Sequence, residues 1–378
     1  MITLKSILPA GLVYDHIVAT GGIGSGIFFS LKNNDTLGRN ESRMATLLPY
    51  KDFCKQHIIM HYIAVLLGAQ VNSDFQSFPI GKIGNDEIGK SLLNQMKAAG
   101  IDIKNVSVSD HLNTLFSVCY QYPDHSGGNI TTSESASSHV SPEDVSLFFK
   151  DFKLNGSKEI ILAAPEVPVK TRIKLLEYGR LRGSLNVASI LSSEIKEFKN
   201  LEGFAMVDIL AVNLDEARSI AQTDKSVSTK KMIEACIKNL TEIQPSITVL
   251  ITCGSAGVYC YKKNHLEFTP ALKVPVISTA GAGDAFLAGF VAGICCGLPC
   301  MKGAKDDYFS ASPLTSATEL GILLASLSVT SQDTINTEAN AELLYNFIIR
   351  YNLHPGTGFS KMFSGCNQNN YSNILTEV

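Results

Sequence analysis

The sequence predicts an α/β fold, a doubly wound and mostly parallel sheet flanked by helices, with a smaller β-sheet attached. Short runs of apolar and β-branched residues alternate with segments of helical periodicity, as in strand–helix–strand units. With 378 residues, of which 45% are hydrophobic, the chain is long enough to bury a large core. Two segments, near residues 27–50 and 112–138, break this alternation and indicate the smaller sheet.

The strongly periodic segments define the expected elements in order. Helices are expected where apolar residues recur at helical spacing and a glycine follows, as at Gly68 and Gly100. The expected helices cover residues 55–67 and 88–99, and the expected strands cover residues 16–20, 78–83, 159–163, 209–212 and 247–252. Residues 1–354 are predicted to form one domain, followed by an irregular tail at 355–378 that is rich in Gly, Asn and Ser.

Charge and cysteine usage narrow the class of protein. The net charge of −3 and the lack of a Lys/Arg run argue against binding to nucleic acid or to an anionic membrane. The sequence has no run of about eighteen apolar residues that would indicate a membrane span. The nine cysteines are scattered, apart from three on an expected apolar helix, which favours buried thiols over a metal site. We expect a cytoplasmic protein.

Residues 276–290 carry the most distinctive chemistry. A short β-branched run leads into a loop of small residues, then one carboxylate, Asp284, and then an apolar helix. Gly281 and Gly283 allow a tight turn and a close approach to a ligand, and the start of the helix suits a phosphate. A carboxylate beside an anion is useful if it takes the proton of an attacking hydroxyl. A favourable first-turn residue is the simpler alternative for Asp284.

Four motifs in a fixed order support the catalytic interpretation. They are residues 81–92 (G-K-I-G-N-D-E-I-G-K-S-L), 213–216 (N-L-D-E), 252–257 (T-C-G-S-A-G) and 278–286 (S-T-A-G-A-G-D-A-F). Together they resemble the signatures of the ribokinase-like (PfkB) carbohydrate kinases, over roughly residues 13 to 345. The resemblance implies the ribokinase-like fold, in which the two irregular segments form a β lid over the acceptor site.

The resemblance implies an ATP-dependent, Mg²⁺-requiring transfer of the γ-phosphoryl group to a hydroxyl of a small acceptor, most simply a sugar or sugar acid. Asp284 would act as the general base. The backbone N–H groups of Ala282, Gly283 and Asp284 would form the anion hole, with Gly281 allowing the approach. A nucleoside kinase and a catalytically silent sugar- or nucleotide-binding regulator remain alternatives.

Further residues take roles from the same resemblance. Asn213 and Glu216 would serve the Mg²⁺–phosphate region, Glu216 through water, and Thr252 and Gly254 would border the nucleotide. Asn213 could instead cap a helix, and Thr252 and Gly254 could simply end a strand. Ser278 stands where many members of the family have an aspartate that helps to hold a monovalent cation, so the sequence leaves potassium activation open.

The acceptor site departs from the family. The family's G-G-x-x-x-N element is not visible, and its positions fall on Cys54, Lys55 and Ile59. His57 and His61 lie one helical turn apart and share a face, so they could line the acceptor site or bind a metal.

The presumed lid offers other acceptor ligands. Residues 36–43 (T-L-G-R-N-E-S-R) are dense in polar groups, and Arg39 and Arg43 suit a carboxylate or phosphate on the acceptor. Asp35 and Asn40 are the expected partners of sugar hydroxyls. An exposed, solvated loop is the alternative. The low aromatic content favours a sugar over a nucleoside. Lid strands often pair in relatives, which allows a homodimer.

Two competing glycine motifs predict different sites. Residues 84–91 (G-N-D-E-I-G-K-S) match the P-loop pattern, but Asp86 and Glu87 would place two carboxylates where polyphosphate must bind. Residues 21–26 (G-G-I-G-S-G) approach the dinucleotide fingerprint and fail at its last glycine. A turn between the first strand and the lid is the better account of residues 21–26.

Overall fold

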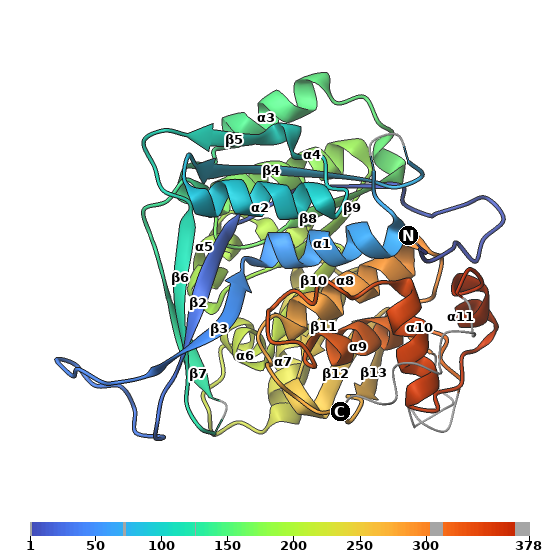
Figure 1. Ribbon diagram of the computed structural model, residues 1–378. Helices are drawn as coiled ribbons and strands as arrows, with labels where there is room; N and C mark the ends of the chain where they lie inside the picture. Colours follow the sequence, from blue (N-terminus) through green and yellow to red (C-terminus); the bar gives the residue numbers. More distant parts are fainter. Residues whose placement is uncertain (1, 71–72, 125, 303–312, 367–378) are drawn as a thin grey trace.

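The protein is built on one large twisted sheet with helices on both faces and a smaller sheet at one side (Figure 1). The computed structural model describes residues 2–70, 73–124, 126–302 and 313–366. Within these residues, nine strands are ordered β13-β12-β11-β10-β9-β8-β1-β4-β5. All neighbours are parallel except β11–β12 and β12–β13. The predicted α/β class is confirmed.

The elements have the following bounds. The strands are β1 His16–Thr20, β2 Gly24–Ser30, β3 Thr46–Phe53, β4 Gln76–Gly84, β5 Val106–Ser109, β6 Leu115–Gln121, β7 Gly127–Thr131, β8 Glu159–Ala163, β9 Leu185–Ser189, β10 Ile209–Asn213, β11 Thr248–Thr252, β12 Gly257–Lys262 and β13 His265–Pro270. The α-helices are α1 Lys55–Leu67, α2 Glu87–Ala98, α3 Pro142–Asp151, α4 Val169–Arg182, α5 Ile195–Asn200, α6 Leu214–Ala221, α7 Thr229–Ile243, α8 Ala282–Cys295, α9 Ala317–Ser328, α10 Ala341–Arg350 and α11 Thr357–Met362.

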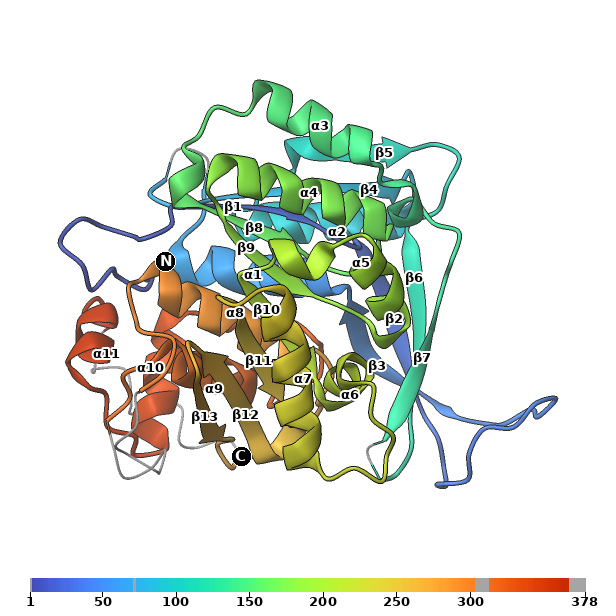
Figure 2. The ribbon, with the colours of Figure 1, turned by 180° about the vertical axis from the view of Figure 1, so that it is seen from behind.

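The two faces of the sheet carry two separate cores. Alternate residues of a strand point to opposite faces, so Ile17 and Ala19 pack with α1, α2, α8 and α9, whereas Val18 packs with α3, α4 and α7. Figures 1 and 2 show these two helical layers from opposite sides. Burial on both faces explains why the central strands are continuous apolar runs in the sequence.

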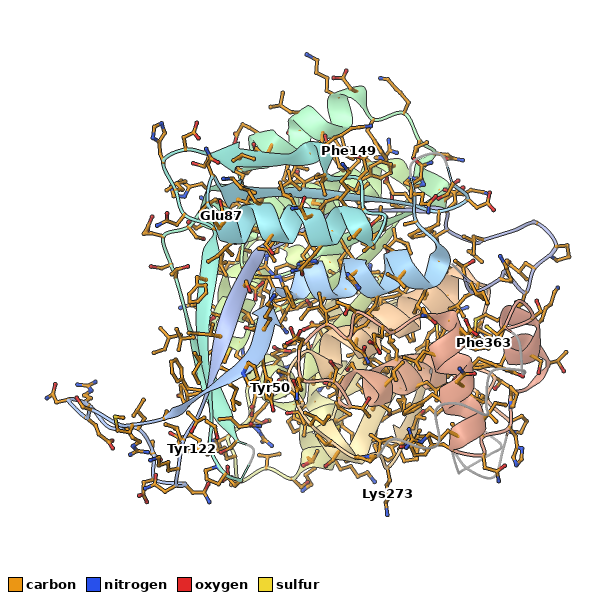
Figure 3. All side chains as sticks on the ribbon, viewed as in Figure 1. Tyr50, Glu87, Tyr122, Phe149, Lys273 and Phe363 are labelled. Carbon is orange, nitrogen blue, oxygen red and sulfur yellow. The ribbon has the colours of Figure 1, made fainter. Side chains whose placement is uncertain are left out.

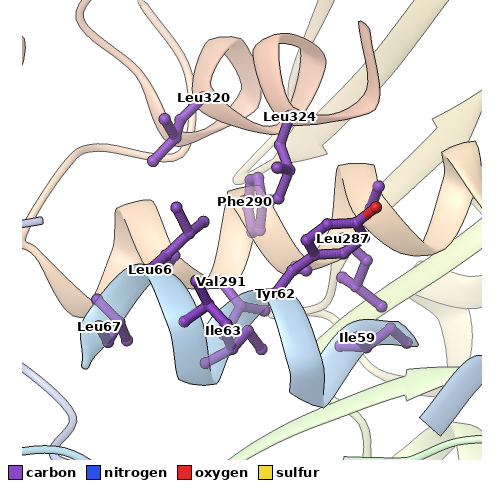
Figure 4. Packing of buried hydrophobic residues seen from close by; sticks show 14 of the residues in the cluster. Ile59, Tyr62, Ile63, Leu66, Leu67, Leu287, Phe290, Val291, Leu320 and Leu324 are labelled. Atoms are coloured by element: carbon purple, nitrogen blue, oxygen red, sulfur yellow. The ribbon is translucent and has the colours of Figure 1, made fainter. Parts of the chain in front are cut away.

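Helices α1 and α8 pack against each other in the first of these cores. Figure 4 shows Tyr62 and Leu66 of α1 beside Phe290 of α8, with Leu320 and Leu324 of α9 on the other side of α8. Gly289 and Gly293 let α9 approach closely, because a Cβ at Gly289 would lie 2.8 Å from the Leu320 carbonyl oxygen. This packing fixes where both helices begin, and both begin at the site described below.

The smaller sheet is a lid of four strands in the order β3-β2-β6-β7. It lies along one side of the body, and the loop between β2 and β3 extends away from it (Figures 1 and 2). Leu47 and Ile130 of the lid are 59% and 68% exposed. The homodimer through the lid stays a prediction.

The end of the chain is more ordered than the sequence predicts. Residues 355–366 are not irregular, since they contain α11, whose Phe359 and Met362 are fully buried against the N-terminal segment and α10. One aromatic and one apolar side chain on a single turn are too short a pattern to show helical periodicity, although they suffice to dock the turn. The rest of the expected tail, 367–378, lies outside the described residues.

The cysteines are free thiols, and most of them are buried. All nine cysteines are free thiols, and Cys295, Cys296 and Cys300 are buried as predicted. In the described part of the chain, we find no group of three His, Cys, Asp or Glu side chains placed to hold a metal ion. None of the helices described there is long and apolar enough to cross a membrane.

The two histidines of α1 belong to the core and do not face the acceptor. His57 is fully buried with its ring edge-on to Phe53, and His61 is 6% exposed. Their four ring nitrogens have no hydrogen-bond partner among the described residues. Burial lowers the pKa of His57 to about 3 and that of His61 to about 4, so both are neutral.

This burial predicts a stability change with pH. Because folding depresses the pKa of His57 from 6.5, the unfolded chain binds more protons below that pH, and stability falls as the pH falls. Between about pH 7.5 and pH 5.5, His57 should account for about 1.4 kcal/mol of lost unfolding free energy. Urea unfolding of His57→Leu should show a loss smaller by that amount, and the exposed His111→Gln control should match the parent. Equal losses in the parent and His57→Leu would contradict the assignment.

Candidate active site

The site lies where several parallel strands end on one edge of the sheet. β1, β8, β10 and β11 run in the same direction, so the residues that follow each strand meet at this edge. Their ends bring Gly22, Glu166, Asn213 and Thr252 there. Helices α1 and α8 start at the same edge. The carboxyl edge of an open α/β sheet is the usual place for ligands.

Asp284 lies in the first turn of α8 and is mostly buried. Gly281 precedes the helix with a φ of 75°, and a Cβ there would come within 2.8 Å of the Thr334 carbonyl oxygen, so glycine is required. The Ala282 N–H donates to Thr279 at 3.3 Å, while the N–H groups of Gly283 and Asp284 have no acceptor among the described residues. A Cβ at Gly283 would meet open space. Free amides beside open space suit a phosphoryl group.

Lys55, the first residue of α1, supplies a positive charge next to Asp284. Its Nζ lies 3.9 Å from Asp284 Oδ1, and the two side chains are 26% and 14% exposed. Burial raises the pKa of the Asp284 carboxyl, and the Lys55 ammonium opposes that rise. In turn, Asp284 raises the pKa of Lys55. Lys55 therefore favours the ionised carboxylate that a general base requires.

Glu166 is a second acidic group beside Lys55. It adopts a φ of 75°, which is strained for a non-glycine residue, and its Oε2 accepts the Lys55 backbone N–H at 3.3 Å. A Cβ at Gly22 would come within 2.7 Å of Oε2, so the predicted glycine turn is what makes room for Glu166. Burial raises the pKa of Glu166 to about 7, against the opposing effect of Lys55.

Asn213 and Glu216 form a reciprocal cap at the start of α6. The Glu216 N–H donates to Asn213 Oδ1 at 2.9 Å, and the Asn213 N–H donates to Glu216 Oε2 at 2.8 Å. Asn213 therefore caps α6, as the alternative prediction for this residue stated. Burial raises the pKa of Glu216, Lys55 lowers it, and Asp284 raises it, so Glu216 lies within electrostatic reach of the α8 start.

The remaining motif residues take simple structural positions. The Thr252 hydroxyl donates to the Val212 carbonyl at 3.4 Å, and Gly254 follows with a φ of 56° in a short turn. Ser278 is buried, and its Oγ accepts the Ala280 N–H at 3.3 Å, so a hydroxyl rather than a carboxylate occupies that position.

A pocket of about 270 Å³ lies between the lid and the loop that leads into α8. Phe28, Tyr50, Asp52 and Tyr120 contribute its lid side, together with Cys119, Gln121, Ser126, Gly127, Gly128 and Asn129, and Ser278, Thr279 and Ala280 form the other side. The pocket reaches Ala280, four residues before Asp284 on the loop that leads into α8. Its size suits a single-ring acceptor.

The structure does not bring the predicted acceptor residues of the β2–β3 loop to this pocket. Asp35, Arg39 and Asn40 are exposed on the projecting loop. Arg43 is held within that loop by Glu41, Asn33 and the Asp35 carbonyl. Near the middle of the loop, the Leu37 N–H donates to the hydroxyl of Tyr122, labelled in Figure 3, at 2.9 Å. The solvated-loop alternative therefore describes this segment, and His57 is likewise absent from the pocket.

Sequence reasoning missed Asp52 and Glu166 and gave Lys55 no role. Each lies in a segment without a motif and reaches the site only through folding. One local signal existed for Lys55, because a charged residue stands where the family has glycine.

Neither competing glycine motif forms its site. Asp86 caps α2, accepting the Gly89 N–H at 2.7 Å, and its other oxygen accepts the Thr114 N–H at 2.7 Å. A carboxylate thus occupies the place that a P-loop gives to phosphate. Residues 24–26 lie in β2 and lead to no helix, which excludes a dinucleotide-binding turn.

Comparison with known proteins agrees with this geometry. The model of the pfkB family of carbohydrate kinases matches residues 60–341, well over half of the chain. The chain belongs to this family. It is similar to ribokinase of Staphylococcus aureus strain COL, with 29% identity over 240 residues, 62% of this chain and 74% of the relative. It is also similar to fructokinase of Klebsiella pneumoniae, with 25% identity over 243 residues, 62% and 74% of the two chains.

Solved structures show the same fold. The ribokinase of Cryptococcus neoformans in complex with ADP superposes with a TM-score of 0.68 at 17% identity, covering 89% of this chain and 99% of that one. The ribokinase of Arabidopsis thaliana with ribose and ATP gives 0.65 at 16% identity, and 89% of this chain is covered. The protein is thus a carbohydrate kinase of the PfkB family with a ribokinase-like fold.

The excluded P-loop gives a first prediction for this kinase. Lys90 is 56% exposed and pairs with Glu87 at 3.1 Å on the surface of α2. Lys90→Ala should therefore leave turnover within about twofold of the parent, since surface pairs contribute little. Acceptor-dependent ADP release measures this, with Lys55→Ala as the matched lysine at the site. Loss of activity in Lys90→Ala alone would restore the P-loop interpretation.

The Lys55–Asp284 pair gives a second prediction. Without the ammonium, the pKa of Asp284 rises, so the ionised base is populated only at higher pH. In Lys55→Met, the acidic limb of the pH profile of kcat/KM should move to higher pH, and activity at neutral pH should fall about tenfold. The exposed Lys51→Met on β3 is the control and should keep the parent profile. Identical acidic limbs in all three proteins would contradict the pairing.

Proposed function

We propose that this kinase transfers the γ-phosphoryl group of ATP to a hydroxyl of a small carbohydrate, with Asp284 as the general base. One observation carries the proposal, which is the position of Asp284 beside two free amides at the start of α8. A first-turn carboxylate interacts favourably with the helix dipole, but this does not require it to lie mostly buried beside amides that suit an anion. The position has a chemical reason, because the nucleophile must lose a proton where the phosphoryl group arrives.

The chemical step uses the groups at the start of α8. The acceptor hydroxyl gives its proton to the Asp284 carboxylate as its oxygen bonds to the γ-phosphorus. The bond from the γ-phosphorus to the bridging oxygen breaks, and its electron pair leaves with ADP. The N–H groups of Gly283 and Asp284 stabilise the charge on the transferring phosphoryl oxygens. Lys55 keeps Asp284 ionised before transfer.

The carboxylates near α8 also fit a divalent cation. Glu216 and the triphosphate would hold Mg²⁺, largely through water, and the ion would neutralise charge on the phosphates. Glu216 is buried and oriented by its cap with Asn213, so it is a fixed acceptor. The nucleotide would extend toward Thr252 and Gly254 at the end of β11.

The rival interpretation is a catalytically silent homologue that binds a sugar or nucleotide and regulates a partner. Such a protein needs neither a carboxylate at the anion site nor a lysine that keeps this carboxylate ionised. The pairing of Lys55 with Asp284 therefore supports a working kinase.

The test removes the base while preserving its shape. Asp284→Asn should lower kcat by about two to four orders of magnitude, the usual contribution of a general base, with nucleotide affinity little changed. ADP release with Mg²⁺-ATP and a panel of sugars measures turnover, and fluorescent nucleotide titration measures binding. The exposed Asp110→Asn should behave as the parent. Near-equal turnover of Asp284→Asn and the parent would refute the mechanism.

A further inference from the structure

Asp52 is a carboxylate of the lid pocket that the transfer step does not use. It is partly buried on β3, and its Oδ2 accepts hydrogen bonds from Ser117 Oγ at 2.8 Å and from Cys119 Sγ at 3.2 Å. Its Oδ1 has no partner among the described residues, and neither oxygen forms an ion pair there. Its second carboxylate oxygen is therefore open to a ligand that carries hydrogen-bond donors or a positive charge.

The charged groups nearest to Asp52 do not include a cation that pairs with it. Asp52 raises the pKa of both Asp284 and Glu166, so the three carboxylates repel one another across the site. Lys55 is the cation that acts on Asp284 and Glu166, and its ammonium lies toward Asp284. An acidic acceptor would add to this repulsion. A positively charged acceptor would reduce it.

Aromatic rings line the same pocket as this carboxylate. Phe28 and Tyr50 lie edge to face with their ring centroids 6.4 Å apart, and Tyr120 also lines the pocket. Tyr50, labelled in Figure 3, lies on β3 two residues before Asp52. Aromatic faces attract cations, and they do so more strongly when the cation is partly desolvated. A carboxylate beside aromatic rings is the arrangement that binds an ammonium group.

We propose that the acceptor of this kinase carries a protonated amine that binds Asp52 in the pocket that Phe28 and Tyr50 also line, and that the acceptor is an amino sugar. This inference rests on the proposed function, because the amino sugar must also present a hydroxyl to Asp284. The pocket of about 270 Å³ accommodates one sugar ring. The amine then distinguishes the acceptor from neutral sugars and from the sugar acids that the loop arginines suggested.

The experiment compares matched ligands that differ only in the charged group. Isothermal titration of the full chain with ADP and Mg²⁺ present would use aminohexose–hexose pairs of gluco, galacto and manno configuration, with glucuronate as the acidic ring analogue. For at least one pair, the aminohexose should bind about tenfold or more tightly than the hexose, the equivalent of one ion pair, and glucuronate should bind most weakly. In Asp52→Asn this preference should disappear. The exposed Asp110→Asn should retain it.

A second variant keeps the proposal testable if Asp52→Asn fails to fold. Tyr50→Leu removes a ring without changing charge, and it should reduce the preference for the amine several-fold. Equal binding of amine and hexose by the parent would overturn the inference, as would absence of binding by every aminohexose. A preference that survives in Asp52→Asn would also overturn it. Transfer to neutral sugars that depends on Asp284 would leave the proposed function standing while refuting the amine.

Discussion

The structure depends on the packing of α1 against α8. Apolar side chains such as Tyr62 and Phe290 fix the two helices so that both start at the carboxyl edge of the sheet (Figure 4). Two helix N-termini, each with a partial positive charge, therefore meet at one place. Lys55 adds a full positive charge to this region, and Asp284 balances it at 3.9 Å. The core thus determines the electrostatics of the site.

The same junction explains why the site tolerates so many acidic groups. Asp284, Glu166 and Glu216 are all buried enough to raise their pKa values, and the Lys55 ammonium opposes each rise. Asp52 lies beyond this cation, at the lid. Under the proposed mechanism, the arrangement separates a region for phosphate, at the α8 amides, from a region for the acceptor, at the lid. A kinase needs both regions, because it must hold an anionic donor and a hydroxyl acceptor at the same time.

The sequence predicted what short, local patterns encode. The bounds of β1, β8 and α1 were predicted to the residue, because apolar runs and a terminal glycine specify them. Asp284 and the Asn213–Glu216 pair could be proposed as site residues because each lies in a contiguous motif. Asp52 and Glu166 could not be proposed, because only tertiary structure brings them near the start of α8. The loop residues Arg39 and Arg43 lie away from the pocket, because a dense polar segment looks the same in the sequence whether it binds a ligand or faces solvent. The burial of His57 follows from packing around α1, which its polar character concealed.

The most direct measurement follows the phosphoryl group itself. The parent and Asp284→Asn would be incubated with Mg²⁺-ATP labelled with ¹⁸O in the γ-phosphoryl group and with a panel of sugars and amino sugars, and the products would be analysed by mass spectrometry. The account predicts a labelled phosphate ester of an acceptor in the parent and a loss of about two orders of magnitude or more of that ester in Asp284→Asn. Label found only in inorganic phosphate, or equal ester formation by both proteins, would contradict it.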